Sequence, residues 1–324
     1  MNKILLCSLG ALLSTTALPA ATNVPPQTNV AAVALADTNN LVEQEFKQLE
    51  DMDDTAAAEV DKWIRDNQAF AAQGAGAPNT ELNQRIRARF EPVRKAYEDF
   101  IARHPNHARA RLAYGSFLHD LGDEDGGEAQ TEKARELDPK NPAAWNNLAN
   151  HYGHSGPVKK AFEYYAKAIE LNPAEPVYYQ NFATTVYLFR KDAMEFYRIT
   201  EQQVFDKALD LYAKAFKLDP KNFNLATDLA QTHYGIRPTR TDDALRAWTN
   251  ALAVAHDEIE REGVHIHLAR FKALAGRTNE ARAHLNAVTN AMYNELKKRI
   301  VRNLDAGTEK AKSTNEPPAA VEKK

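Results

Sequence analysis

The pentapeptide LDPKN occupies residues 137–141 and occurs again at 218–222. Two related turns precede the second copy: RHPNH around Pro105 and LNPAE around Pro173. The prolines of the first three turns are 34 residues apart, and the proline of the second LDPKN follows 47 residues after Pro173, which is one period and 13 residues. A fixed period of this length is typical of stacked two-helix units. The pentapeptide therefore predicts a helical repeat protein.

One period reads as two amphipathic helices around a tight turn. In 142–155 apolar residues recur every three or four positions, Gly156 and Pro157 interrupt them, and the same spacing resumes in 158–171. Alanines on the shared face let the two backbones approach closely, and large side chains fill the remaining space. The Asp-Pro of LDPKN stops each second helix, because proline cannot continue a helix and excludes helical geometry before it. The Asn that follows can cap the next helix.

This period resembles the tetratricopeptide repeat, a family of helical-hairpin solenoids. The matching positions are Trp145, Leu148, Ala149, Tyr152, Gly156, Ala161, Tyr165, Ala168 and Pro173. The first repeat (108–141) departs from the signature, with Arg111 where the family favours Trp and Gly127 where it favours Ala. The resemblance covers residues 105–290. It implies an all-α, right-handed α-solenoid of about five helix-turn-helix repeats.

The amino terminus has the layout of a secretory signal peptide. MNK supplies a positive charge, ILLCSLGALL a short apolar run, and STTALPAA an exit of small residues. We expect 1–20 to be removed and the chain to be exported to the periplasm or the exterior of a bacterium. Cys7 is the only cysteine and lies in this segment, so the mature chain would have no thiol for a disulfide or a metal site.

The remaining segments flank the repeats. Residues 21–40 lack a helical period and predict a flexible linker, and 41–104 predict helices that cap the solenoid, with a break near Asp53 and Asp54. At the other end, 291–306 predict a capping helix and 307–324 a disordered tail.

The 13 extra residues fall in the third repeat and predict a longer hairpin. Apolar spacing continues from Phe182 to Phe196, so we expect the first helix to run on, and TEQQ at 200–203 predicts an early start of the second helix through a capping box. The aromatic residues of this hairpin could form a docking surface; they are Phe189, Phe196 and Tyr197. In the alternative interpretation, they pack within the hairpin or against a neighbouring repeat.

The resemblance also implies ligand-facing positions on the first helix of each repeat, along a concave groove. Carried over to this chain, they are Asn146, Asn147, Asn150, Gln180, Asn181, Thr184, Thr227, Asp228 and Gln231. Neutral amides both donate and accept hydrogen bonds, which suits the backbone of an extended peptide. The alternative is plain solvated polarity or bonds between repeats. The carboxylate clamp known in the family is not expected, because Asp228 stands at its arginine position.

Other functions find little support in the residues. The net charge is −3 with both signs interleaved, which argues against nucleic acid as a partner. No phosphate loop or catalytic motif is present, so neither an enzyme nor a cofactor is predicted. Two histidine pairs, His151/His154 and His265/His267, have no carboxylate on the same helix face, and we interpret them as surface residues rather than metal ligands.

The sequence therefore predicts a non-catalytic, exported scaffold that binds a partner protein or an extended peptide in its concave groove. The competing hypothesis is a structural component of a cell-envelope assembly. Such a component would use its convex face, the hairpin of the third repeat or contacts with further copies of itself, so homo-oligomers stay open. After removal of the signal, no segment predicts a membrane span.

Overall fold

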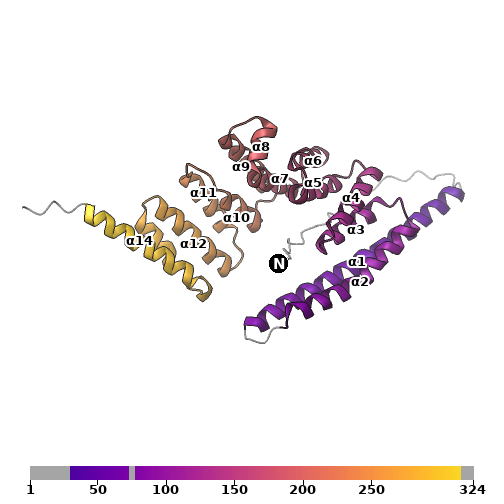
Figure 1. The fold of residues 1–324 in the computed structure, drawn as a ribbon, viewed down its shortest axis with the longest axis horizontal. Helices are drawn as coiled ribbons and strands as arrows, with labels where there is room; N and C mark the ends of the chain where they lie inside the picture. Colours follow the sequence, from indigo (N-terminus) through magenta and orange to yellow (C-terminus); the bar gives the residue numbers. More distant parts are fainter. Residues whose placement is uncertain (1–29, 73–76, 315–324) are drawn as a thin grey trace, which may run out of the picture. The chain divides into compact units, whose positions relative to one another are not determined.

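The computed structural model describes residues 30–72 and 77–314, which form fourteen α-helices and one short 3-10 helix and contain no strand (Figure 1). The all-α class predicted from the sequence is confirmed. The predicted signal peptide, 1–20, lies outside the described residues. The chain divides into two compact units, the first ending at His151 and the second beginning at Tyr152, and each is described by itself.

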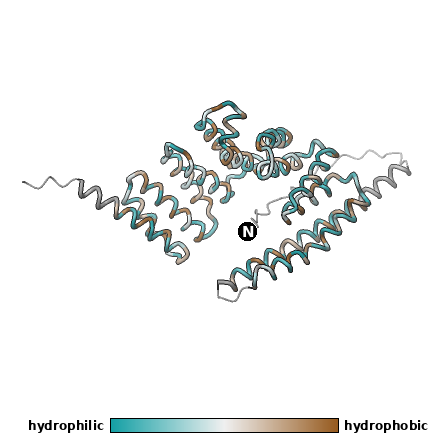
Figure 2. The backbone as a smooth tube through the Cα atoms, in the orientation of Figure 1, coloured by the Kyte–Doolittle hydropathy of each residue, from teal (hydrophilic) through white to brown (hydrophobic). Residues whose placement is uncertain are grey.

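The first unit begins with two long helices, α1 (Val30–Ala72) and α2 (Asn79–Arg103), which lie side by side (Figure 1). Hydrophobic positions recur along both helices among hydrophilic ones (Figure 2). The buried rings of Phe46, Tyr97 and Phe100 join these helices to Phe117 of α3 (Ala108–Asp120). Each buried ring contributes about 1.5–3 kcal/mol relative to its exposed state. The two helices therefore cover the apolar face of the first repeat, as a solenoid end requires.

Three predicted helix limits are wrong. Helix α1 already includes 30–40 of the predicted linker, and it runs without a break through Asp53 and Asp54. Neither Pro nor Gly occurs in this helix, and an aspartate in a helix interior costs only about 0.7 kcal/mol. Asp53 also accepts a hydrogen bond of 2.7 Å from the hydroxyl of Tyr97 on α2. At the carboxyl end, helix α14 (Asn294–Thr314) includes the first residues of the predicted disordered tail.

The first repeat consists of α3 and α4 (Glu124–Leu137), and α5 (Pro142–Ser155) follows across the boundary of the units. Both LDPKN motifs work as predicted. Asp138 and Asp219 are the C-cap residues of α4 and α9, and the side chains of Asn141 and Asn222 accept backbone N–H bonds of 3.0 Å at the start of α5 and α10. Proline, aspartate and asparagine therefore fix the helix ends locally.

A second device recurs at the proline turns. The carbonyl oxygen of the proline accepts a hydrogen bond from the side chain six residues later. These bonds are Arg111 Nε to Pro105 (2.8 Å), Trp145 Nε1 to Pro139 (2.9 Å) and Tyr179 Oη to Pro173 (3.1 Å). Three different side chains thus supply the same donor at the same position of the repeat. Arg111 therefore replaces the tryptophan of the family signature without loss of this bond.

In the second unit, α6 (Val158–Leu171) begins after Pro157, and its Tyr164 packs against Tyr152 at the end of α5. Three helix pairs follow. They are α7 (Pro176–Leu188) with α9 (Glu201–Leu218), α10 (Phe223–Thr232) with α11 (Thr241–Ala253), and α12 (Glu258–Leu274) with α13 (Thr278–Asn286). After the 3-10 turn η1 (Ala291–Tyr293), α14 packs against α12 and α13 through buried Ile300 and Leu304. This is the contact expected of a closing helix.

The third repeat differs from its prediction. The capping box at Thr200 and Gln203 is confirmed, but the first helix ends at Leu188 and a separate helix, α8 (Arg190–Tyr197), follows. The backbone leaves helical geometry at Phe189, with φ −102° and ψ 43°. Because a one-residue break leaves the apolar spacing almost in phase, the pattern could not reveal it. No helix in the described part of the chain is both long and apolar enough to cross a bilayer.

Candidate functional site

The ligand-facing positions of the first unit are partly engaged in bonds within the unit. The Nδ2 of Asn146 donates to Asn147 (3.3 Å), and the Nδ2 of Asn147 donates to Ser116 Oγ on α3 (3.0 Å). Asn146 is only 5% exposed, and Asn150 is half-buried. Asn147 therefore joins neighbouring repeats, which is the alternative role that the sequence left open, and Asn146 donates to it from the same helix.

The second unit brings two ligand-facing positions into contact across neighbouring repeats. Gln180 on α7 donates from Nε2 to Asp228 on α10 over 2.8 Å. One turn further along α7, Thr184 lies 2.7 Å from the hydroxyl of Tyr212 on α9. Burial raises the pKa of the Asp228 carboxyl, and the bond from Gln180 opposes that shift.

The other ligand-facing positions of this unit differ in exposure. Gln231 is exposed, whereas Asn181 and Thr227 are half-buried. The Thr227 hydroxyl donates to the backbone carbonyl of Asn224 over 2.8 Å. The polar surface of α7 and α10 therefore combines the fixed pair Gln180–Asp228 with a more exposed amide.

The aromatic residues of the third-repeat hairpin mostly face inward. The rings of Phe196 and Tyr197 lie 5.5 and 5.7 Å from the ring of buried Phe162 on α6. Burial raises the pKa of the Tyr197 hydroxyl, and Lys207 of α9 lies 4.3 Å from its ring centre. Phe189 is half-buried at the break between α7 and α8. The packing interpretation therefore describes Phe196 and Tyr197 better than a projecting docking surface.

The interpretation of the histidines as surface residues is confirmed for His154, which is exposed, and wrong for His151. His151 is buried, and its side chain lies beside two carboxylates of α4 that no inspection of α5 alone could reveal. Its Nδ1 is 3.5 Å from Glu124 Oε2, and its Nε2 is 3.2 Å from Glu128 Oε2. His119, at the end of α3, places Nδ1 3.2 Å from the same Glu124 oxygen. Burial lowers the pKa of the His119 imidazole, an effect that Glu124 opposes.

The two histidines of the second pair, His265 and His267, contact different residues. His265 lies 3.0 Å from His284 of α13, Nδ1 to Nδ1. His267 stacks on Trp248 with ring centres 4.0 Å apart and planes 3° apart, and its Nδ1 lies 2.8 Å from the Tyr234 hydroxyl. Burial lowers the pKa of His267 to about 4. His267 is therefore a neutral packing residue at physiological pH.

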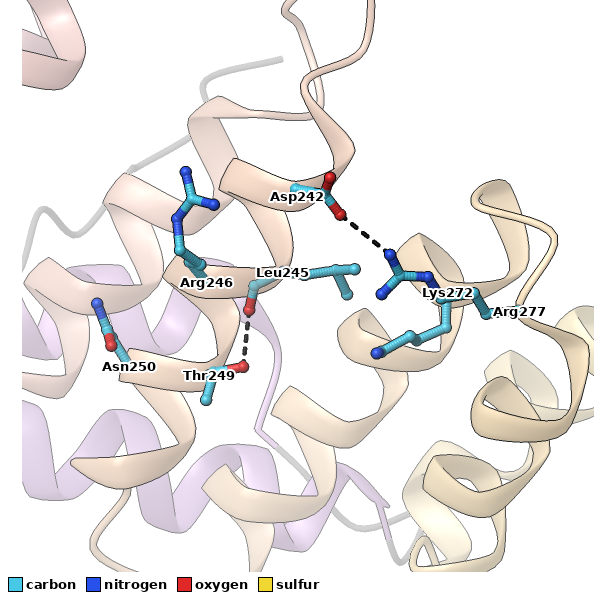
Figure 3. Close-up of a pocket in the computed structure, with 7 residues that line it drawn as sticks. All are labelled: Asp242, Leu245, Arg246, Thr249, Asn250, Lys272 and Arg277. Atoms are coloured by element: carbon cyan, nitrogen blue, oxygen red, sulfur yellow. Dashed lines mark hydrogen bonds and ion pairs between the residues drawn. The ribbon is translucent and has the colours of Figure 1, made fainter.

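A shallow pocket that the sequence did not predict lies between α11 and the α12–α13 turn (Figure 3). It is lined by Asp242, Leu245, Arg246, Thr249, Asn250, Lys272 and Arg277. Arg277 pairs with Asp242 across the pocket at 3.3 Å, and Lys272 pairs with Glu280 at 2.5 Å. One wall of the pocket is α11, the second helix of the fourth repeat, and none of the ligand-facing positions lines the pocket.

The comparison with family models agrees with the helix pairs of residues 94–176. A family model of the tetratricopeptide repeat matches residues 94–142 and 125–176. A search of curated proteins gives no significant match.

Among solved structures, the chain is similar to YrrB, described as a TPR protein with an unusual peptide-binding site (14% identity, 64% of this chain and 99% of that chain, TM-score 0.48). It is also similar to PilF of Pseudomonas aeruginosa (18% identity, 61% and 84%, TM-score 0.47). A further similar structure is TTC0263, a TPR protein of Thermus thermophilus (22% identity, 61% and 98%, TM-score 0.43).

The described helices thus define an all-α protein of successive helix pairs, and proline turns precede α3, α5, α7 and α10. Residues 94–176 of this chain match the tetratricopeptide-repeat family. This repeat fold suggests a protein-interaction scaffold. The right-handed twist of the whole solenoid stays a prediction.

Proposed function

We propose that this chain is a non-catalytic scaffold that binds a partner protein or an extended peptide along the first helices of its repeats. The observation that carries the proposal is the Gln180–Asp228 pair, which joins the first helices of two successive repeats by a 2.8 Å bond beside exposed Gln231. Such a pair holds hydrogen-bonding groups in fixed positions before a ligand arrives. A preformed surface reduces the entropy lost on binding.

The chemistry of this pair indicates what it would bind. Gln180 uses one of the two N–H donors of its amide in the bond to Asp228. The ionised Asp228 carboxylate accepts hydrogen bonds only, and burial, which raises its pKa, removes water from that charged form. A ligand that supplies N–H donors, from its backbone or from a basic side chain, would restore that solvation. We therefore propose an extended peptide with donors near Asp228 as the ligand.

The test uses the purified full chain and a displayed library of random extended peptides. The affinity of a selected peptide is then measured by calorimetry for the wild type, Gln180→Ala and Gln231→Ala. Because one hydrogen bond contributes about 0.5–1.5 kcal/mol, each variant should bind about 2- to 12-fold more weakly. Asn250→Ala on α11 is the matched control, since it removes an exposed amide from a second helix. Equal affinity of both groove variants and the wild type would refute binding along α7 and α10.

The same variants separate the groove from the convex face. A photo-reactive residue introduced at 231 or at 250 in living cells would report which face contacts the partner. Cross-links from 231 support the groove. Cross-links confined to 250 would instead favour the competing hypothesis of an envelope assembly that uses second helices, and cross-links between copies of the chain would indicate self-association.

We also propose that the protein is exported. The proposal is supported by the basic, apolar and small-residue order of its first twenty residues. Mass spectrometry of protein recovered from the envelope fraction should find an amino terminus at Ala21 or Thr22 rather than Met1. Cytosolic protein that retains Met1 would contradict export.

A further inference from the structure

We propose that His119, Glu124 and His151 bind one divalent transition-metal ion, and that Glu128 positions His151. The three ligands come from α3, α4 and α5, and all belong to the first compact unit. One ligand atom from each residue lies within 4.8 Å of the other two. This site is separate from the polar surface of α7 and α10, so the proposal goes beyond peptide binding.

The distances between these atoms suit a tetrahedral ion. Zinc ligands at about 2.0–2.2 Å from the metal are separated from each other by roughly 3.3 Å in a tetrahedron. Glu124 Oε2 lies 3.2 Å from His119 Nδ1 and 3.5 Å from His151 Nδ1. Both nitrogens therefore already stand at tetrahedral separation from one carboxylate oxygen. The ligand nitrogens of the two imidazoles lie within 4.8 Å of each other, and their rings must approach to close the set around an ion.

Glu128 orients His151 toward that ion. The Nε2 of His151 lies 3.2 Å from Glu128 Oε2, so an N–H at Nε2 can donate to this carboxylate. That tautomer leaves the lone pair on Nδ1, which faces the acceptor oxygen of Glu124. In that tautomer, Nδ1 of His151 and the Glu124 oxygen can both bind one cation. A carboxylate that holds the far nitrogen of a metal-bound histidine is a recurrent arrangement in metal sites.

The backbone of α4 is adapted to the position of His119. The imidazole lies over Gly127, where an added Cβ would stand 2.7 Å from three ring atoms, Cγ, Cδ2 and Cε1. Gly127 is the position at which the family favours Ala. Its departure from the signature therefore makes room for the ring. Glu124 stands in the first turn of α4, where the helix dipole favours a charged carboxylate.

The donor set selects the class of metal. Two imidazoles and one carboxylate suit zinc, cobalt, nickel or copper, whereas calcium and magnesium prefer oxygen ligands alone. Three protein ligands leave one position of a tetrahedron open. The side chain of Glu124 is 49% exposed, so this fourth position reaches solvent and can take water or a donor atom of a partner.

The test is metal binding by the full chain, purified without a tag and stripped with a chelator. Zinc is titrated in competition with a chromophoric chelator, and cobalt is followed by its visible absorption. We expect one ion per chain. His119→Gln and Glu124→Gln should each weaken binding at least about tenfold, and Glu128→Gln about 10- to 100-fold while the stoichiometry stays at one. His154→Gln, on the same helix as His151 but exposed, is the control that should bind as the wild type does.

Circular dichroism establishes that each variant is folded, and His119→Gln and Glu124→Gln provide two independent changes in case one of them is not. If the wild type binds no zinc or cobalt, the cluster holds only protons and the proposal is wrong. Binding that neither variant weakens beyond the His154→Gln control would place the ion elsewhere and overturn the assignment equally.

Discussion

The contact between Gly127 and His119 leads to a prediction in which two physical effects oppose each other. Glycine in a helix interior costs about 0.5–1 kcal/mol relative to alanine. Gly127 lies in the second turn of α4, so replacement by alanine should stabilise the helix by that amount if nothing else changed. The new Cβ, however, would stand 2.7 Å from three atoms of the His119 ring.

The ring must then move, because the overlap includes Cγ, which lies next to the backbone of His119. Overpacking of this kind costs about 1–3 kcal/mol. The displaced ring also loses its 3.2 Å contact with Glu124. We expect Gly127→Ala to be neutral to about 2 kcal/mol destabilising in the wild type. In a His119→Ala background, the same change should stabilise the protein by about 0.5–1 kcal/mol, so the coupling energy is about 1–3 kcal/mol.

Urea denaturation of the wild type, the two single variants and the double variant gives the coupling energy directly. All four proteins are stripped of metal so that ion binding does not contribute. Hydrogen exchange of the α3 and α4 amides adds a local measurement, since a repeat protein can open one region before another. If Gly127→Ala changes the free energy of unfolding equally in both backgrounds, within about 0.5 kcal/mol, the ring does not occupy the space above Gly127.

Three further outcomes follow from the described contacts. The pKa of His267 is about 4 in the folded protein and about 6.5 in the unfolded chain, so the unfolded chain binds the proton more readily. The free energy of unfolding should therefore fall by at most about 3 kcal/mol between pH 6.5 and pH 4. In urea denaturations at a series of pH values, His267→Gln should remove this decrease. Thr200→Ala removes the capping box of α9 and should lower the free energy of unfolding by about 1 kcal/mol. Thr239→Ala, in an exposed loop, is the control, and equal Tm values of the two variants would contradict a stabilising cap. Trp145→Phe removes the donor to Pro139 and should cost about 1 kcal/mol, whereas unchanged thermal unfolding would show that the bond does not contribute.

Helix ends that depend on one residue and its neighbours could be predicted from the sequence. The LDPKN turns and the Thr200 capping box are examples, because proline geometry and side-chain caps act within a few residues. The break at Phe189 could not be predicted, since nothing in its residue type forces it and the apolar spacing continues beyond it. Likewise, the Asp53–Asp54 pair looks like a stop in the sequence, but the hydroxyl of Tyr97 engages Asp53 within α1.

The proposed metal cluster shows a different limit of prediction from the sequence. Spacing along α5 relates His151 only to His154, which lies on the same helix but differs in burial. The carboxylates near His151 stand 23 and 27 positions earlier in the chain, on α4. Pairing of the helices brings them together, and no spacing rule within one helix contains that information. The one available signal in the sequence is Gly127, which stands where the family favours alanine.

Two departures from the repeat signature in the same repeat now have different physical meanings. Arg111 replaces tryptophan, yet it donates the same bond to the proline carbonyl, so the local structure is kept and no further role is required. Gly127 replaces alanine and gives up about 0.5–1 kcal/mol of helix stability. The absence of a Cβ at this position leaves space for the His119 ring, which lies beside Glu124 and near His151. This lower helix stability is expected if the imidazole, the carboxylate and the second imidazole act together. We therefore assign the metal to this repeat.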